Sequence, residues 1–169
     1  ALNNKGNNNL TIEEIALSTQ KGQIKFFLHQ DNSMNSIVDS DNKVLKDEFP
    51  WDNPEFITTT VVNTTTLDDY MDRNLSDKEK FVLKIDTQGN ELGILKNGVS
   101  VLRQTEICIV EYMFTRAYKS DFVFSDLTSF MIQNQFECKG ALSISKRPSK
   151  KISAVDFLFV RNNNSAANA

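Results

Sequence analysis

Two continuous apolar segments of strand length constrain the fold of this chain more than any other feature. They are FVLKI at 81–85 and EICIV at 106–110, and a helix-like stretch that ends at Asn97-Gly98 lies between them. Strands that helices cover on both faces of a sheet read as continuous apolar runs, whereas strands with one solvated face alternate. We therefore predict an α/β fold with a mostly parallel sheet and helices on both of its faces.

The other elements follow from hydrophobic periodicity and from turn residues. Residues 30–56 are rich in Asp, Asn and Ser, show no period and are predicted to form a long loop. Strands are predicted at 10–17, 23–29, 58–66, 81–86 and 106–112 and, as an antiparallel C-terminal pair, around 136–145 and 153–161. Helices are predicted at 67–75, 90–97 and 122–135, with a further helical turn around 99–103. One domain is expected over 1–161, followed by a disordered tail over 162–169.

Composition narrows the classes of function. The chain has 169 residues and a net charge of −3 without a basic stripe, so we expect one domain and no nucleic-acid partner. It contains no apolar run of the roughly 18 residues that a membrane span needs, and its start has no apolar signal core. We therefore expect a cytoplasmic protein without a membrane span. A single histidine and two cysteines outside a CxxC pattern give no support to a His-based zinc site or a Ser–His–Asp triad. No metal is predicted, although sites built from oxygen ligands stay open.

Charged residues accompany the carboxyl ends of the two apolar strands. Lys84 and Asp86 are two positions apart and point to the same face, and Glu111 ends the next strand. An ammonium group in a buried central strand is costly unless it is paired. Open α/β sheets bind ligands outside the carboxyl ends of their strands. We therefore interpret Lys84, Asp86 and Glu111 as a functional cluster, with a purely structural ion pair as the alternative.

The DTQG turn at 86–89 allows two other interpretations. In the simpler one, Gly89 relaxes a strand-to-helix turn and Asn90 or Thr87 caps the helix. Glu91 would then complement the helix dipole. In the other, DTQG is the Asp-x-x-Gly turn of a GTP-binding protein. That interpretation also requires a GxxxxGK[ST] loop and a downstream Asn-Lys-x-Asp, and since the chain has neither, we reject it.

Three segments together resemble the FkbM family of S-adenosylmethionine-dependent methyltransferases. They are TTTLDDYM at 64–71, LKIDTQGNELGILKNG at 83–98 and IVEY at 109–112. The central run matches the family pattern at Lys84, Ile85, Asp86, Gly89, Glu91, Leu95 and Lys96. It departs from the pattern at Gln88, where an acidic residue is common, and at Asn97, which intervenes before the glycine.

The resemblance implies O-methyl transfer from S-adenosylmethionine to a hydroxyl of a small-molecule or saccharide acceptor. Asp86 would accept or orient the hydroxyl proton, and Lys84 would keep Asp86 ionised or pair with Glu111. By resemblance alone, Ala16 and Leu17 would flank the adenine of the cofactor. Trp51 is interpreted as a hydrophobic anchor of the long loop, with a lid or an acceptor contact as the alternative.

The resemblance also implies that part of the family's domain is missing from the chain. The family's glycine-rich cofactor loop and its ribose-binding acidic residue have no counterpart, since Gly6 and Gly22 stand alone before residue 81. We expect a partial, Rossmann-like methyltransferase sheet without its first two strands, with an open edge beside 81–86. The 169-residue chain alone should then neither bind the cofactor nor transfer methyl groups. An inactive methyltransferase-like binding or scaffold domain is the alternative function.

Overall fold

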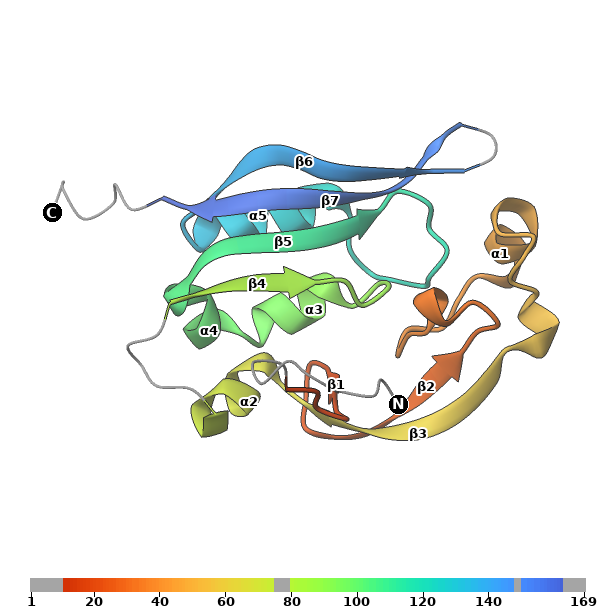
Figure 1. Ribbon diagram of the computed structural model, residues 1–169, viewed down its shortest axis with the longest axis horizontal. Coiled ribbons are helices and arrows are strands. Elements are labelled where there is room, and N and C mark those ends of the chain that lie inside the picture. The colour runs from red at the N-terminus through yellow and green to blue at the C-terminus, as the bar shows by residue number, and fades with distance from the viewer. Residues whose placement is uncertain (1–10, 75–79, 148–149, 163–169) are drawn as a thin grey trace, which may run out of the picture.

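The computed structural model describes residues 11–74, 80–147 and 150–162, which form two sheets and the helices packed against them (Figure 1). The N-terminal strands are β1 (Ala16–Leu17), β2 (Gly22–Leu28) and β3 (Thr58–Thr65), and the C-terminal ones are β4 (Phe81–Ile85), β5 (Thr105–Met113), β6 (Phe136–Lys146) and β7 (Ile152–Arg161). The α-helices are α1 (Asn42–Glu48), α2 (Leu67–Asn74), α3 (Glu91–Lys96), α4 (Val99–Gln104) and α5 (Phe124–Gln133). Two 3-10 turns, η1 (Asn32–Met34) and η2 (Pro54–Phe56), complete the set.

The C-terminal sheet has the strand order β4-β5-β7-β6. The strands β4 and β5 are parallel, whereas β7 is antiparallel to both β5 and β6. The α/β class is confirmed and so is the antiparallel C-terminal pair. The mostly parallel arrangement is wrong, because the β6–β7 hairpin returns β7 into the position next to β5 and makes the sheet mixed.

The N-terminal sheet has the order β1-β3-β2, with β1 parallel and β2 antiparallel to β3. The strand predicted at 10–17 is shorter than expected, since within the described residues only Ala16–Leu17 pair with a neighbour. The predicted loop at 30–56 is also wrong, because it contains α1 and both 3-10 turns. Asp41 begins α1 by accepting hydrogen bonds from the amides of Lys43 and Val44. Seven residues are too few to show a helical period in the sequence.

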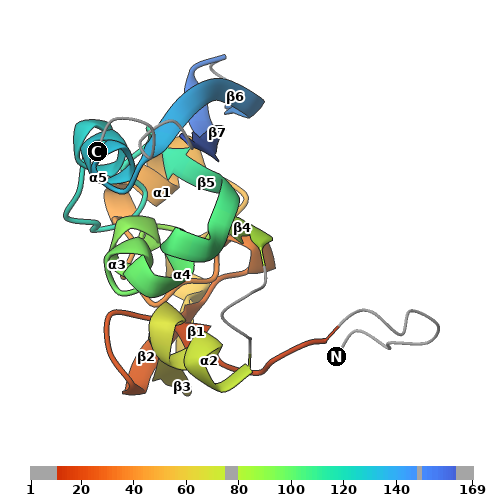
Figure 2. The same cartoon turned by 90° about the vertical axis from the view of Figure 1, so that its left-hand side faces the viewer.

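Helices α3, α4 and α5 lie on one face of the C-terminal sheet (Figure 2). They enclose the main core, whose largest fully buried side chains are Phe159, Ile94, Leu95, Leu102, Leu127 and Met131. The opposite face is open: Val82 is 60% exposed and the side chain of Lys84 is 51% exposed. The prediction of a sheet covered on both faces, with Lys84 buried, is therefore wrong for the part of the chain that the structure describes.

Within the described residues, β4 is an edge strand, as expected beside 81–86. Thr66 begins α2 as predicted, since its hydroxyl accepts a hydrogen bond from the amide of Asp69 at 3.0 Å. Beyond Asn162, the predicted tail lies outside the described residues. None of the described helices has the length and apolar character needed to cross a membrane.

Candidate functional site

The turn that connects β4 to α3 has an unusual backbone. Gln88 and Gly89 both have positive φ angles, of 58° and 107°. A Cβ atom added at Gly89 would lie 3.0 Å from the Cβ of Tyr118. Glycine is therefore required here both for its backbone conformation and for the close approach of Tyr118.

Glu91 holds this turn from the inside. Its carboxylate accepts hydrogen bonds from the amide of Thr87 at 3.0 Å, from the Thr87 hydroxyl at 3.2 Å and from the amide of Gly89 at 3.0 Å. Burial raises the pKa of Glu91, and the hydrogen bonds from Gly89 and Thr87 partly oppose that rise. Glu91 thus clamps the turn, a role that goes beyond complementing the dipole of α3.

The N-terminal half of the chain contacts the same turn. The hydroxyl of Ser36 donates to the carbonyl oxygens of Gln88 at 2.8 Å and of Thr87 at 3.2 Å. The hydroxyl of Tyr118 donates to the carbonyl of Met34 at 2.7 Å. The turn is therefore fixed between the segment that follows β2 and the segment that follows β5.

Lys84, Asp86 and Glu111 come together at the carboxyl ends of β4 and β5. The Nζ atom of Lys84 lies 3.1 Å from an Asp86 oxygen and 3.5 Å from an oxygen of Asp156 on β7. Gln88 joins the two predicted carboxylates, because its amide nitrogen donates to Asp86 and to Glu111, each at 3.0 Å. Of the two expected partners of Lys84, Asp86 and Glu111, the ammonium pairs with Asp86, and Asp156 is an additional partner.

The cluster changes the protonation of its members. Burial, and next the neighbouring charge of Asp86, raise the pKa of Glu111 to about 7. The hydrogen bond to Asp86 raises the pKa of Lys84, which is therefore a cation at neutral pH. Near neutrality Glu111 is protonated in part of the molecules, so it can share a proton with Asp86.

Oxygen atoms of Asp86, Glu111 and Asp156 lie within 4.8 Å of one another, a spacing that could hold a metal ion. Oxygen ligands of this kind suit hard divalent cations. The ammonium group of Lys84 already lies against two of these carboxylates and supplies a positive charge there. The ammonium group of Lys84 therefore offsets part of the negative charge of the three carboxyl groups.

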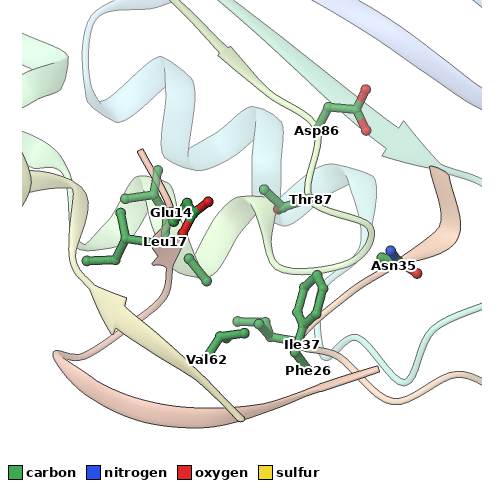
Figure 3. A pocket seen from close by; sticks show the side chains of 10 residues that line it. Glu14, Leu17, Phe26, Asn35, Ile37, Val62, Asp86 and Thr87 are labelled. Atoms are coloured by element: carbon green, nitrogen blue, oxygen red, sulfur yellow. The ribbon is translucent and has the colours of Figure 1, made fainter. Parts of the chain in front are cut away.

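A largely apolar cavity of about 560 Å³ opens between β1 and the turn after β4 (Figure 3). Ala16, Leu17 and Asp86 all line it, so the predicted cofactor residues and the first catalytic candidate share one space. Figure 3 shows the apolar side chains of Phe26, Ile37 and Val62 on the side opposite Asp86 and Thr87. The remaining lining residues are Glu14, Ile15 and Asn35. We call this space the β1 cavity.

A second cavity, of about 470 Å³, also includes Asp86 in its lining. Its walls come from the loop after β2, the segment after α1, the ends of β4 and β5, and the β6–β7 hairpin. Its lining includes Asp31, Trp51, Gln88, Glu111, Lys146 and Arg147. We call this space the hairpin cavity. Asp86 therefore lies between two cavities of different character.

Sequence reasoning missed Asp156, Gln88 and the hairpin cavity. Asp156 interrupts the apolar run AVDFLFV, which is the same signal that drew attention to Lys84. Gln88 was noticed as a departure from the family pattern but not as a bridge between carboxylates. The hairpin cavity joins segments more than a hundred positions apart, from Asp31 to Ala154, and no local pattern reveals such a meeting.

Comparison with known protein families identifies the same family as the motif at 83–98, which forms the turn between β4 and α3. The family model described as Methyltransferase FkbM domain matches residues 1–138 of the chain. Neither the curated proteins nor the solved structures contain a match. The matched span includes the β1 cavity, Asp86 and Glu111, whereas Asp156 and the β6–β7 hairpin tip lie beyond it.

Proposed function

The chain belongs to the FkbM methyltransferase family, and on this premise we propose that it serves O-methyl transfer from S-adenosylmethionine to a hydroxyl group of a sugar or similar small polar acceptor. The position of Asp86 between the two cavities carries the proposal. One cavity would take the methyl donor and the other the acceptor, so that the reacting groups meet beside one carboxylate.

The lining of the β1 cavity suits the donor. Apolar side chains such as Phe26, Ile37 and Val62 can pack against the faces of an adenine ring, and Ala16 and Leu17 lie on the β1 side. Glu14 supplies a carboxylate that can accept hydrogen bonds from hydroxyl groups. A volume of about 560 Å³ lies in the range of small-molecule sites. Bound S-adenosylmethionine supplies an electrophilic methyl group on a sulfonium centre.

Asp86 has the position and the charge of a base or an orienting group. Methylation of a hydroxyl would form an O–CH₃ bond as the S–CH₃ bond of the sulfonium breaks, with S-adenosylhomocysteine as the neutral leaving group. The hydroxyl loses its proton, which must be accepted. The carboxylate of Asp86 accepts it in our proposal, and the Lys84 ammonium lies 3.1 Å from that carboxylate. Glu111 then takes up the proton through its contact with Asp86, since its own pKa is about 7.

Asp86→Asn tests the proposal in the full-length protein, called parent length below. We expect methyl transfer to fall by about 10²–10⁴-fold, because the amide cannot accept the proton, while donor binding stays within a few-fold. Radiolabelled methyl transfer and calorimetric titration with S-adenosylmethionine measure the two effects. Asp69→Asn, which alters an exposed carboxylate outside the cluster, is the control and should change neither. Turnover that stays within a few-fold of wild type would reduce Asp86 to a turn residue.

The alternative function is an inactive binding or scaffold domain. The same calorimetric titration separates the two functions, because such a domain would bind no methyl donor at parent length. We expect the 169-residue chain alone to show no measurable donor binding, since the glycine-rich loop has no counterpart within it. Micromolar binding by this chain would contradict that expectation.

A further inference from the structure

We propose that the hairpin cavity is a binding site for a neutral saccharide, whose ring stacks on the indole of Trp51. Its role as the acceptor site depends on the function proposed above, but the binding itself does not. Two observations support it: the way Trp51 is held and the charges around the cavity.

Trp51 is an exposed aromatic side chain on a rigid support. The sequence suggested that Trp51 anchors the loop as a buried hydrophobic side chain. It is 51% exposed and therefore does not do so from within the core. The next residue, Asp52, is fully buried, and its carboxylate lies 2.6 Å from the ring nitrogen Nδ1 of His29, which is also fully buried. The other Asp52 oxygen accepts from the amides of Gln30 at 3.0 Å and Asp31 at 3.3 Å. These contacts fix the backbone beside Trp51 while its ring faces the cavity.

The ring of Trp51 also packs edge-on against Phe49, with 5.6 Å between the ring centroids. The guanidinium of Arg147 lies 5.6 Å from the centroid of the Phe49 ring. The negative face of an aromatic ring attracts groups with partial positive charge. The C–H groups on one face of a pyranose carry such charge, so a sugar ring matches an indole held in this way.

The charges around the cavity favour a neutral ligand over an anionic one. Arg147 is already paired with Glu48 on α1, which leaves Lys146 as the cation without an ion pair to any described residue. Asp31, Asp86 and Glu111 place carboxyl groups on the same lining. Hydrogen bonds from Ser33 and the side chain of Trp51 lower the pKa of Asp31, so it is ionised at neutral pH and can accept from sugar hydroxyls.

The test uses Trp51 as its own reporter, because it is the single tryptophan of the chain. The 169-residue protein is titrated with the methyl glycosides of glucose, galactose, mannose, fucose and rhamnose while tryptophan emission is recorded. We expect a saturable change with at least one of them at millimolar concentration or below. Glucuronate and glucose 6-phosphate should bind more weakly than the neutral sugar of the same ring. No saturable change with any of the five glycosides, or tighter binding of the anionic sugars, would overturn the proposal.

Variants locate the binding by calorimetry or by ligand-observed NMR. Trp51→Ala should weaken binding by about tenfold or more, as removal of a central aromatic contact does, and Trp51→Phe by less. Phe56→Ala is the matched control, because Phe56 is 61% exposed, lies in the neighbouring η2 turn and is absent from the cavity lining. Equal affinity of wild type and Trp51→Ala would place the sugar elsewhere and contradict the proposal.

Failure of this proposal differs from failure of the proposed function. Donor binding and methyl transfer at parent length without saccharide binding to the hairpin cavity would refute the saccharide site alone. Saccharide binding that depends on Trp51, without donor binding at parent length, would support the site and identify the protein as a saccharide-binding domain of the methyltransferase fold.

Discussion

At the scale of single residues, the site is a group of three carboxyl groups, of which Glu111 has a strongly raised pKa. Oxygen atoms of Asp86, Glu111 and Asp156 lie within 4.8 Å of one another, and a neighbouring like charge disfavours the ionisation of a carboxyl group. Lys84 pairs with Asp86 and Asp156, whereas Glu111 is raised to a pKa of about 7. The amide of Gln88 bridges two of the carboxyl groups without adding a charge.

The raised pKa of Glu111 makes the free energy of unfolding depend on pH. Glu111 has an ordinary pKa of 4.5 and a pKa of about 7 in the fold, so the folded protein binds the extra proton between these values. The stabilisation from this proton is complete below pH 4.5 and is lost as the pH rises through 7. The variant Glu111→Gln has no carboxyl group to titrate at this position. As the pH rises from 4.5 to 7, its free energy of unfolding should increase by about 1–2 kcal/mol relative to that of wild type, a range that allows for solvent screening of a half-buried group.

Urea unfolding at a series of pH values measures this difference. Glu106→Gln, at an exposed position on the same strand, is the control, and its difference from wild type should not vary over the range. If the difference between Glu111→Gln and wild type were also independent of pH, the proposed sharing of a proton between Glu111 and Asp86 would be wrong.

At the scale of elements, the turn between β4 and α3 is where local sequence and tertiary structure agree most closely. The strand, the glycine, the helix and its C-terminal Asn97-Gly98 are visible in the sequence because each has a local signal. The clamp by Glu91 is not visible, since a glutamate in the first turn of a helix has a simpler explanation in the helix dipole. Helix α1 was missed for the opposite reason, because its cap at Asp41 precedes a segment too short to show a period.

The Glu91 clamp predicts a specific loss of stability. Glu91→Ala leaves the amides of Thr87 and Gly89 without their acceptor inside the protein, so we expect a loss of about 2–4 kcal/mol in the free energy of unfolding. Glu91→Gln keeps one acceptor oxygen and should lose less. Chemical denaturation measures both, and Glu106→Ala on β5 is the exposed control. A loss for Glu91→Ala no larger than that of the control would contradict the clamp.

At the scale of the whole molecule, the pairing of strands could not be derived from the sequence. Continuous apolar runs predicted β4 and β5 as parallel neighbours, and they are. The same runs suggested cover on both faces, yet Val82 and Lys84 lie on an open face, because an apolar residue does not show what packs against it. The position of β7 between β5 and β6 depends on contacts between distant segments, and so does the hairpin cavity. The meeting of charged residues at the strand ends could be predicted, but the shape of the space around them could not.

Among the described residues β4 has no partner on one edge, and this affects the behaviour of the protein in solution. Exposed strand edges are templates for pairing with another molecule, and charged side chains on the edge oppose it. Lys84 is one such charge, but Val82 beside it is apolar and 60% exposed.

We expect the 169-residue chain to associate as its concentration rises, and Val82→Lys to shift that association to higher concentration, as light scattering after size exclusion would show. Ile132→Lys should do less, because Ile132 is similarly exposed, at 67%, but lies on helix α5, which has no strand edge to offer. Equal effects of the two substitutions would mean that added charge, and not the edge of β4, governs how concentrated the protein can become.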